Sequence, residues 1–219
     1  MISIEPLGDC AYLAHLPDER SAAGWARALR RLDWKGVTDV VLAYRSVAVF
    51  TDPDRLAPED LGARLQTIDL AASGSFAVGR LVEIPVLYDG EDLPDVADRT
   101  GLTSDEVIAL HSGTTYEVFA IGFLPGFPYA GYLPDQLSGL ARRESPRVRV
   151  PAGSVAIAGR QTGIYPGESP GGWHLLGRTP MRLVDLEAGI FAIQAGDRIR
   201  FYPILTDEFE IRRHDHRHP

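Results

Sequence analysis

The sequence predicts an α+β protein made of two small domains, and two observations support this. The first 75 residues give the order strand–strand–helix twice, which is typical of a small antiparallel sheet with helices on one face. After Thr115 many short strands alternate with glycine and proline turns, which is typical of a barrel or sandwich. Because Gly74-Ser75 lies between the two patterns, we predict one domain over residues 1–76 and another over 77–219.

Short apolar runs and helix signals define the elements of the first domain. Strands are predicted over 2–6, 12–16, 37–44 and 47–51. Asp18 opens the first helix, whose apolar residues recur at helical spacing until Gly36 ends it. Pro58 and the acidic residues after it open a second helix, because proline suits the first turn and acids suit the positive end of a helix. Residues 71–74 close this second helix.

The second domain begins with a predicted strand over 81–88 and a short helix or turn over 92–99. Thr103 and Glu106 form a capping box, so they open a helix that Gly113 ends. The remaining strands are predicted over 116–123, 148–150, 154–158, 173–176, 181–185, 190–193 and 198–201. The tail over 212–218 alternates histidine with charge, and we predict a solvated end in preference to a weak metal site.

The segment from Gly122 to Pro180 dominates the second domain. It holds 11 of the 22 glycines and 8 of the 16 prolines, so backbone there is fixed in many turns. Its charged residues give a net charge of +3, whereas the whole chain carries −8. A basic, glycine-rich loop region on an acidic protein suits a small anion or an acidic partner. The alternative is that its six arginines lie on ordinary solvated strand faces.

Several classes of protein are excluded by composition and by missing motifs. The charge of −8 argues against nucleic acid, and no run approaches the ~20 apolar residues that cross a membrane. Without a readable secretory signal, we predict a cytoplasmic location. The single cysteine, Cys10, excludes an internal disulfide and a cysteine-based zinc cluster, and no metal site is predicted. The single lysine, Lys35, follows a helix, which argues against a Walker, Schiff-base or biotinylated lysine.

The basic segment supplies the candidate substrate-binding residues. Arginine presents a planar, permanently charged fork that binds carboxylate or phosphate, while neutral side chains add donors and acceptors. The candidates are Arg142, Arg143, Arg147, Gln161, Thr162 and Tyr165. This set could polarise an amide or a carboxylate, but it contains no evident base, nucleophile or nucleotide site. A partner chain is therefore expected to complete the site, and the alternative is a cluster of structural turns without a ligand.

Ser169 and His174 are the candidates for catalysis, because a serine nucleophile needs a histidine partner. They lie five residues apart in the glycine-rich segment, but this spacing alone is weak support. We favour the alternative interpretation over covalent catalysis. In it, Ser169 caps a turn and His174 faces solvent from a strand.

Long ordered motifs in the second half of the chain resemble one known family. They are FLPGFPY at 123–129, PAGSVAIAG at 151–159, QTGIYP at 161–166, SPGGW at 169–173 and GRTP at 177–180. The chain resembles the allophanate hydrolase subunit 1 family, also called the 5-oxoprolinase B-subunit family. The same module occurs in the carboxyltransferase region of urea carboxylase and in the Kip inhibitor of a histidine kinase. The resemblance is strongest from about Leu81 to Pro203.

The resemblance implies a small α+β N-terminal domain followed by a cyclophilin-like β-barrel. It also implies that the chain works with a C-subunit, plus an A-subunit, in the ATP-dependent opening of 5-oxo-L-proline to L-glutamate. ATP would then be a co-substrate of the assembled complex, and no cofactor is expected to bind tightly to this chain. The substrate carries a carboxylate and a lactam, which suits the arginines and loop amides identified above.

Two other functions remain open at this point. One is a carboxyltransferase or allophanate-type protein that works on urea or a related amide, with biotin carried by another chain because Lys35 does not suit it. The other is an inhibitor of a histidine kinase of the Kip type, which would act through proline-rich loops such as 123–129.

Overall fold

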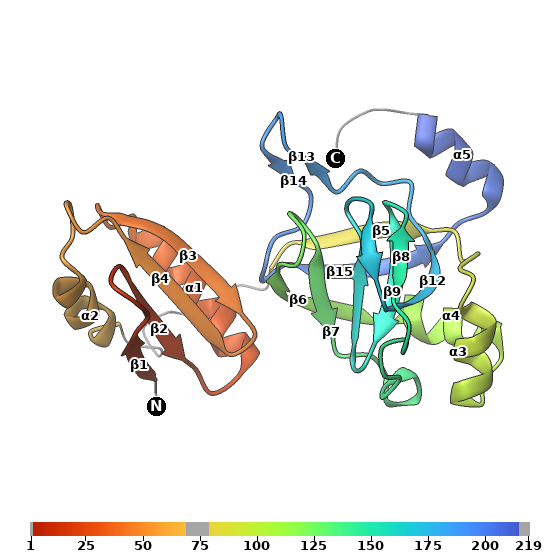
Figure 1. Ribbon diagram of the computed structural model, residues 1–219, viewed down its shortest axis with the longest axis horizontal. Coiled ribbons are helices and arrows are strands. Elements are labelled where there is room, and N and C mark those ends of the chain that lie inside the picture. The colour runs from red at the N-terminus through yellow and green to blue at the C-terminus, as the bar shows by residue number, and fades with distance from the viewer. Residues whose placement is uncertain (1, 69–78, 215–219) are drawn as a thin grey trace. The chain divides into compact units, whose positions relative to one another are not determined.

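The computed structural model describes residues 2–68 and 79–214, which form two compact units over Met1–Gly79 and Arg80–Pro219 (Figure 1). The predicted boundary after residue 76 and tail residues 215–218 lie outside the described residues. The helix that Pro58 opens ends at Gln66, so the prediction that residues 71–74 close it is wrong. In the described part of the chain, every helix is too short or too polar to cross a bilayer. The domain limits and the cytoplasmic location stay predictions.

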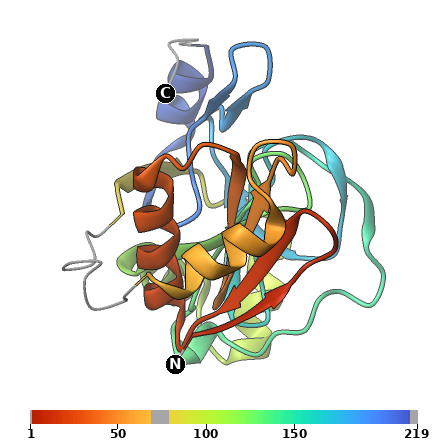
Figure 2. The ribbon, with the colours of Figure 1, turned by 90° about the vertical axis from the view of Figure 1, so that its left-hand side faces the viewer.

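The N-terminal unit has the predicted element order. Its elements are β1 (Ser3–Pro6), β2 (Ala11–His15), α1 (Glu19–Leu32), β3 (Val37–Ala43), β4 (Ser46–Thr51) and α2 (Pro58–Gln66). The strands pair antiparallel in the order β1-β2-β4-β3. Helix α1 packs against β3 and β4, and α2 packs against β1 and β2 (Figure 2).

Helix α1 begins where the sequence predicted and ends earlier. The side chain of Asp18 accepts a hydrogen bond from the Ser21 amide at 2.7 Å, which satisfies one free donor of the first turn. Trp25 is fully buried, so the amphipathic pattern does define the packed face. The helix ends at Leu32 because Asp33 adopts the left-handed conformation with φ 45°, so the prediction that Gly36 ends it is wrong.

The C-terminal unit contains most of the strands and three of the five helices described. Its elements are β5 (Leu81–Val86), α3 (Leu93–Thr100), α4 (Ser104–Gly113), β6 (Thr115–Ile121), β7 (Pro128–Gly131), η1 (Asp135–Leu137), β8 (Arg147–Val150), β9 (Ser154–Ala158), β10 (Gln161–Ile164), β11 (Ser169–Gly171), β12 (His174–Arg178), β13 (Val184–Asp185), β14 (Ile190–Phe191), β15 (Arg198–Pro203) and α5 (Thr206–His214).

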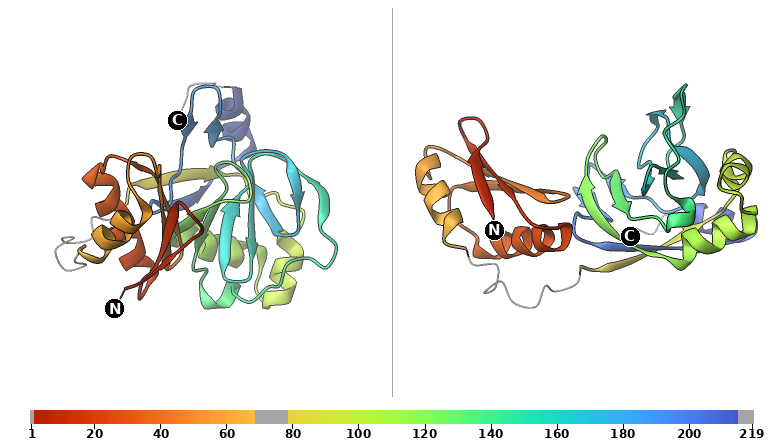
Figure 3. Two further views of the ribbon diagram at one scale, coloured as in Figure 1. Left: turned by 60° about the vertical axis from the view of Figure 1, so that its left-hand side comes forward. Right: turned by 90° about the horizontal axis from the view of Figure 1, so that it is seen from below.

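One curved, mostly antiparallel sheet organises this unit in the strand order β5-β15-β6-β7-β10-β9-β12, and only β5 and β15 pair in parallel (Figure 3). Its first and last strands approach each other just beyond β5. There Leu87 and Arg178 exchange two backbone hydrogen bonds of 2.9 Å each. Strands β8 and β11 form a separate ribbon, as do β13 and β14. Helices α3 and α4 pack together, and α4 also packs against β15.

Two kinds of element in this unit were not predicted. Strands β7, β10 and β11 lie in stretches that glycine and proline marked as turns, but β7 and β10 are paired in the sheet and β11 pairs with β8. Gly159 makes the tight turn that joins β9 to β10, with φ 60°. Helix α5 was also missed: residues 212–214 are helical and not frayed, although they are exposed as the prediction of a solvated end requires.

The interior of the C-terminal unit contains a buried histidine with two hydrogen-bonded ring nitrogens. His111 is 0% exposed and its ring stacks on Phe201 with centroids 4.4 Å apart. Thr162 Oγ1 donates to the Ala156 carbonyl, so it accepts from His111 Nε2 at 2.8 Å. Nδ1 then accepts from the Tyr88 hydroxyl at 2.7 Å. The imidazole is therefore neutral and fully satisfied.

Candidate functional site

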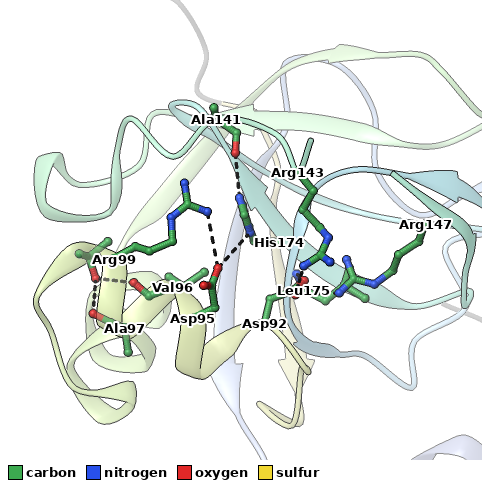
Figure 4. A network of polar contacts seen from close by, with 11 residues as sticks. Asp92, Asp95, Val96, Ala97, Arg99, Ala141, Arg143, Arg147, His174 and Leu175 are labelled. Carbon is green, nitrogen blue, oxygen red and sulfur yellow. Dashed lines mark hydrogen bonds and ion pairs between the residues drawn. The ribbon is translucent and has the colours of Figure 1, made fainter. Parts of the chain in front are cut away.

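A buried carboxylate connects the basic segment to the body of the C-terminal unit (Figure 4). Asp92 precedes α3 and its side chain is 4% exposed. Its Oδ1 atom accepts from Arg143 Nη1 and from Arg147 Nη2, both at 2.7 Å. Its Oδ2 atom accepts from the Leu175 amide at 2.7 Å. Asp92 thus links Arg143 and Arg147 to strand β12 and to the start of helix α3.

The same contacts decide how Arg143 and Arg147 can act. Arg147 Nε also donates to Glu91 Oε1 at 2.6 Å. Burial alone would lower the pKa of Arg147, but the hydrogen bonds and charges of Asp92 and Glu91 outweigh it and raise this pKa. Both guanidinium groups already bind carboxylates of their own chain. Arg143 Nε and Arg147 Nη1 make no hydrogen bond within the described residues, so the substrate role of these two arginines stays a prediction.

Arg142 is different, because its side chain is exposed and makes no ion pair with the residues described. It lies in electrostatic reach of the Tyr165 hydroxyl. Burial raises the pKa of Tyr165, while a backbone hydrogen bond with Trp173 and the positive charges of Arg142 and Arg147 act in the opposite direction. Of the three predicted arginines, Arg142 is the most exposed and thus the most accessible to an external anion.

Tyr165 belongs to an aromatic cluster beneath the loops. Its ring meets that of Phe127 edge to face at 5.2 Å, and Phe127 packs in the same way on Trp173 at 5.4 Å. Gly171 lies directly over the Tyr165 hydroxyl, since a Cβ there would stand 2.3 Å from it. The residue as a whole is 1% exposed and Gly171 covers its hydroxyl, so the lining role of Tyr165 stays a prediction.

One ring of this cluster faces outward. Phe123 is 60% exposed and has a left-handed backbone with φ 66°, a conformation that costs a phenylalanine about 1 kcal/mol or more. Beside it is a cleft of about 400 Å³ between the 124–125 loop, the 166–167 loop and the β13–β14 hairpin. Leu186, which lines the cleft, is 67% exposed. An exposed apolar surface of this kind is typical of a contact site.

The candidate catalytic pair is not arranged as a nucleophile and its base. Ser169 Oγ donates to the carbonyl of Pro170 at 3.1 Å, and His174 Nε2 is bonded to the carbonyl of Ala141 at 2.8 Å. His174 is 1% exposed, so the expectation that it faces solvent is wrong. The two side chains are each bonded to backbone carbonyls and not to each other.

Gln161 and Thr162 lie on β10, between β7 and β9. The side chain of Thr162 turns into the core, where its hydroxyl bonds His111 and the Ala156 carbonyl. Its hydroxyl is therefore already engaged away from the loops. Gln161 is half-buried at the start of the strand, opposite Gly131.

Sequence reasoning missed Asp92, Glu91 and His111. The local pattern marks Asp92 only as the start of a short helix, because an aspartate before a helix commonly caps it. Here it makes no capping bond with its side chain. Its partners lie 51 and 55 residues away, so no local pattern announces them. His111 lies near the end of a predicted helix and carries no signal that separates a core histidine from a surface one.

Comparison with known proteins gives a consistent result. The family model for the carboxyltransferase domain, subdomain C and D, matches residues 2–191. The chain is 41% identical over 214 residues to the 5-oxoprolinase B-subunit of Haemophilus influenzae, covering 91% of this chain and 97% of that protein. It is 34% identical over 233 residues to the 5-oxoprolinase B-subunit of Bacillus subtilis, covering 94% of each.

A solved structure also shares the fold. The crystal structure of TTHA0988 superposes with a TM-score of 0.79 at 39% identity, covering 94% of this chain and 40% of that chain. This chain therefore spans less than half of the TTHA0988 polypeptide, whereas it spans nearly all of the two 5-oxoprolinase relatives.

Proposed function

The chain belongs to the 5-oxoprolinase B-subunit family, and from this premise we propose that it is the B-subunit of an ATP-dependent 5-oxoprolinase. The assembled enzyme would open 5-oxo-L-proline to L-glutamate with hydrolysis of ATP. The observation that carries this proposal is the length of the match, because 41% identity extends over 97% of a 5-oxoprolinase relative and so includes both compact units.

The site chemistry fits a small anionic amide. Arg142 offers an exposed guanidinium that can bind the carboxylate of 5-oxoproline in a bidentate manner. The Tyr165 hydroxyl lies in reach of the same charge. Arg143 and Arg147 each bind Asp92, which fixes the start of the segment that follows Arg142. We assign substrate contact to Arg142, whose side chain is exposed.

We propose that the chain is not active alone. The Ser169 and His174 side chains are committed to backbone carbonyls, so the groups around Arg142 provide binding without a nucleophile–base pair. Two further chains, the C-subunit with the A-subunit, would supply the remaining groups and the ATP site. The longer TTHA0988 chain supports a partner, since it carries this module within a polypeptide of which the module is 40%.

We place the partner on the surface around Phe123. A half-exposed Phe191 and the more exposed Leu186 extend the apolar area from the Phe123 loop, and Phe191 lies against that loop at Gly126. An apolar patch beside a cleft would become buried on assembly, which would offset the strain of the left-handed Phe123. This is the same loop region that carries the candidate site.

We further propose that residues 77–219 form a cyclophilin-like barrel and residues 1–76 a separate domain. The double hydrogen bond between Leu87 and Arg178 supports closure, because it joins the extension of β5 to β12 at the two ends of the strand order.

The test is reconstitution of the three-chain mixture with 5-oxoproline and ATP, followed by measurement of glutamate. We expect turnover with the complete mixture and its loss when this chain is omitted. Equal turnover without this chain would contradict the proposal. Full activity of this chain alone would contradict the requirement for partners.

Carboxyl transfer is the second candidate, because the matching family model describes a carboxyltransferase domain. In that case a biotin-carrying partner would hand carbon dioxide to urea or a related amide. Labelled bicarbonate distinguishes the two, since only carboxyl transfer would place label in the amide product.

A further inference from the structure

Arg142 is fixed through both of its neighbours while its own side chain is exposed. On one side the carbonyl of Ala141 is bonded to His174 Nε2 at 2.8 Å. On the other side the amide of Arg143 donates to the carbonyl of Gly172 at 2.8 Å. The segment just before it is also held, because Gly139 and Leu140 bond the turn at Gly159. The backbone that carries Arg142 therefore has little freedom.

The side chain of His174 makes one of the contacts that hold the backbone around Arg142, and its ring is attached to a rigid part of the fold. His174 begins β12, opposite Ile157 of β9, and is 1% exposed. The next residue, Leu175, donates its amide to Asp92 Oδ2 and accepts from the Asp92 amide at 3.2 Å. Asp92 also holds Arg143, so both sides of Arg142 depend on one junction of strand and helix.

The hydrogen bond of His174 defines which ring nitrogen carries the proton. A carbonyl oxygen can only accept, so Nε2 is protonated and donates to Ala141. The other nitrogen, Nδ1, is buried and lies 4.0 Å from Asp95 Oδ2, which is longer than a hydrogen bond. Asp95 in turn is 3.5 Å from Arg99 Nη1. The ring thus uses its one hydrogen bond on the loop.

We propose that His174 is a positioning residue, which holds the Ala141 carbonyl so that Arg142 presents its guanidinium to the carboxylate of a small anionic lactam. This inference rests on the proposed function, because it takes the substrate class from there. It replaces a direct catalytic role for His174 with an indirect one: the imidazole acts through Arg142 and does not touch the substrate.

The first test uses substitutions that separate the donor from the ring. In H174Q the amide nitrogen of glutamine reaches the place of Nε2 and keeps the donor, whereas H174L fills similar volume without a donor. In the reconstituted complex we expect H174L to raise KM for 5-oxoproline about tenfold with kcat nearly unchanged, as for loss of one charge-assisted contact. H174Q should restore most of this loss. Equal defects in the two variants would overturn the proposal.

A double-mutant cycle tests whether His174 acts through Arg142. R142A should raise KM by at least as much as H174L, and H174L should add little in the R142A background. Additive effects would show that His174 serves the fold or the reaction independently, and would overturn the proposal. R149A is the matched control, because Arg149 is an exposed arginine close in sequence that is paired with Glu168, and its KM should stay at the wild-type value.

A second readout needs neither partners nor turnover. The Arg143 amide is protected by its bond to Gly172, so we expect H174L to speed hydrogen exchange in the 139–147 peptide of the isolated chain while the rest of the C-terminal unit is unchanged. H174Q should leave that exchange slow. Slow exchange in H174L would overturn the positioning role. If exchange responds but the wild-type complex makes no glutamate, the proposed function fails and the positioning role stands.

Discussion

His111 and His174 are both buried histidines of the C-terminal unit, yet their surroundings differ in every other respect. His111 lies in the core, stacked on Phe201, and both of its ring nitrogens are hydrogen-bonded to side chains. His174 lies beneath an exposed loop and uses one nitrogen on the Ala141 carbonyl, while Nδ1 faces Asp95 at 4.0 Å. A carboxylate thus lies near the His174 ring, whereas the ring of His111 meets neutral groups.

This comparison separates a polar group that stabilises a fold from one that shapes a site. A neutral, fully bonded histidine in the core contributes to stability and couples to pH through burial. A histidine that donates its hydrogen bond to a loop carbonyl holds a surface residue in place. The pattern of bonded ring nitrogens therefore distinguishes the two roles better than burial, which is nearly equal.

The largest effect should come from removing Asp92, whose carboxylate binds the amide of Leu175, the residue after His174. D92A leaves two arginines without their shared carboxylate and the Leu175 amide without its acceptor. We expect a loss of about 3 kcal/mol in the free energy of unfolding, at the low end for a buried pair because Arg143 is partly exposed. Chemical denaturation would measure it. D98A removes an exposed aspartate on helix α3, which Asp92 precedes, and should change stability little. Equal stability of D92A and wild type would contradict the role assigned to Asp92.

The next effect concerns His111 and sharpens the contrast through pH. Burial lowers the pKa of His111 to about 3 from the ordinary 6.5. Unfolding therefore takes up a proton between pH 3 and pH 6.5. The contribution of neutral, buried His111 to the free energy of unfolding is complete above pH 6.5 and is lost as pH falls toward 3. Relative to pH 7, about 2 kcal/mol should be lost at pH 5.

H111F would isolate this contribution, because the destabilisation that it causes at pH 7 should shrink by the same amount at pH 5. Denaturation of both proteins at the two pH values measures the difference. H15N is the control, since the His15 ring is exposed and bonded only to Glu5. Parallel pH profiles for wild type and H111F would show that His111 is not the group responsible.

The smallest effect tests how tightly the loops near Arg142 are packed. A Cβ at Gly171 would stand 2.3 Å from the Tyr165 hydroxyl, so G171A must displace that buried ring. We expect a loss of about 1.5 kcal/mol in stability and a higher KM for 5-oxoproline. In G167A the added methyl group meets nothing within 4 Å, so both quantities should stay near wild type. Similar behaviour of the two variants would mean that the loop relaxes freely around Tyr165.

Much of the fold was predictable because its signals are local. The capping side chains of Asp18 and of Thr103 with Glu106 both appear where the sequence placed helix starts. Strands of alternating or continuous apolar residues were found as well. Strands β7 and β10 were missed because glycine and proline in them resembled turns, although sheet pairing overrides that preference. Helix α5 was missed because its apolar pattern is weak.

The candidate site was predictable only in composition. The sequence located an arginine-rich segment and an aromatic loop, and in the structure Arg142 of this segment is exposed whereas Tyr165 is buried. The sequence could not show that Arg143 and Arg147 bind Asp92, because Asp92 lies in a stretch with no motif. Nor could the sequence show that His174 is buried, because the strand pattern allows a histidine on either face of the strand.

By itself the sequence determined the two-part α+β organisation, most helix starts and the family, because caps, periodicity and ordered motifs act over a few residues. Tertiary structure alone decided which charges meet. Asp92 reaches Arg143 across 51 residues, and His174 reaches Ala141 across 33. Such pairs depend on how strands and loops cross in space, so the chemistry available at Arg142 is set by folding and not by spacing.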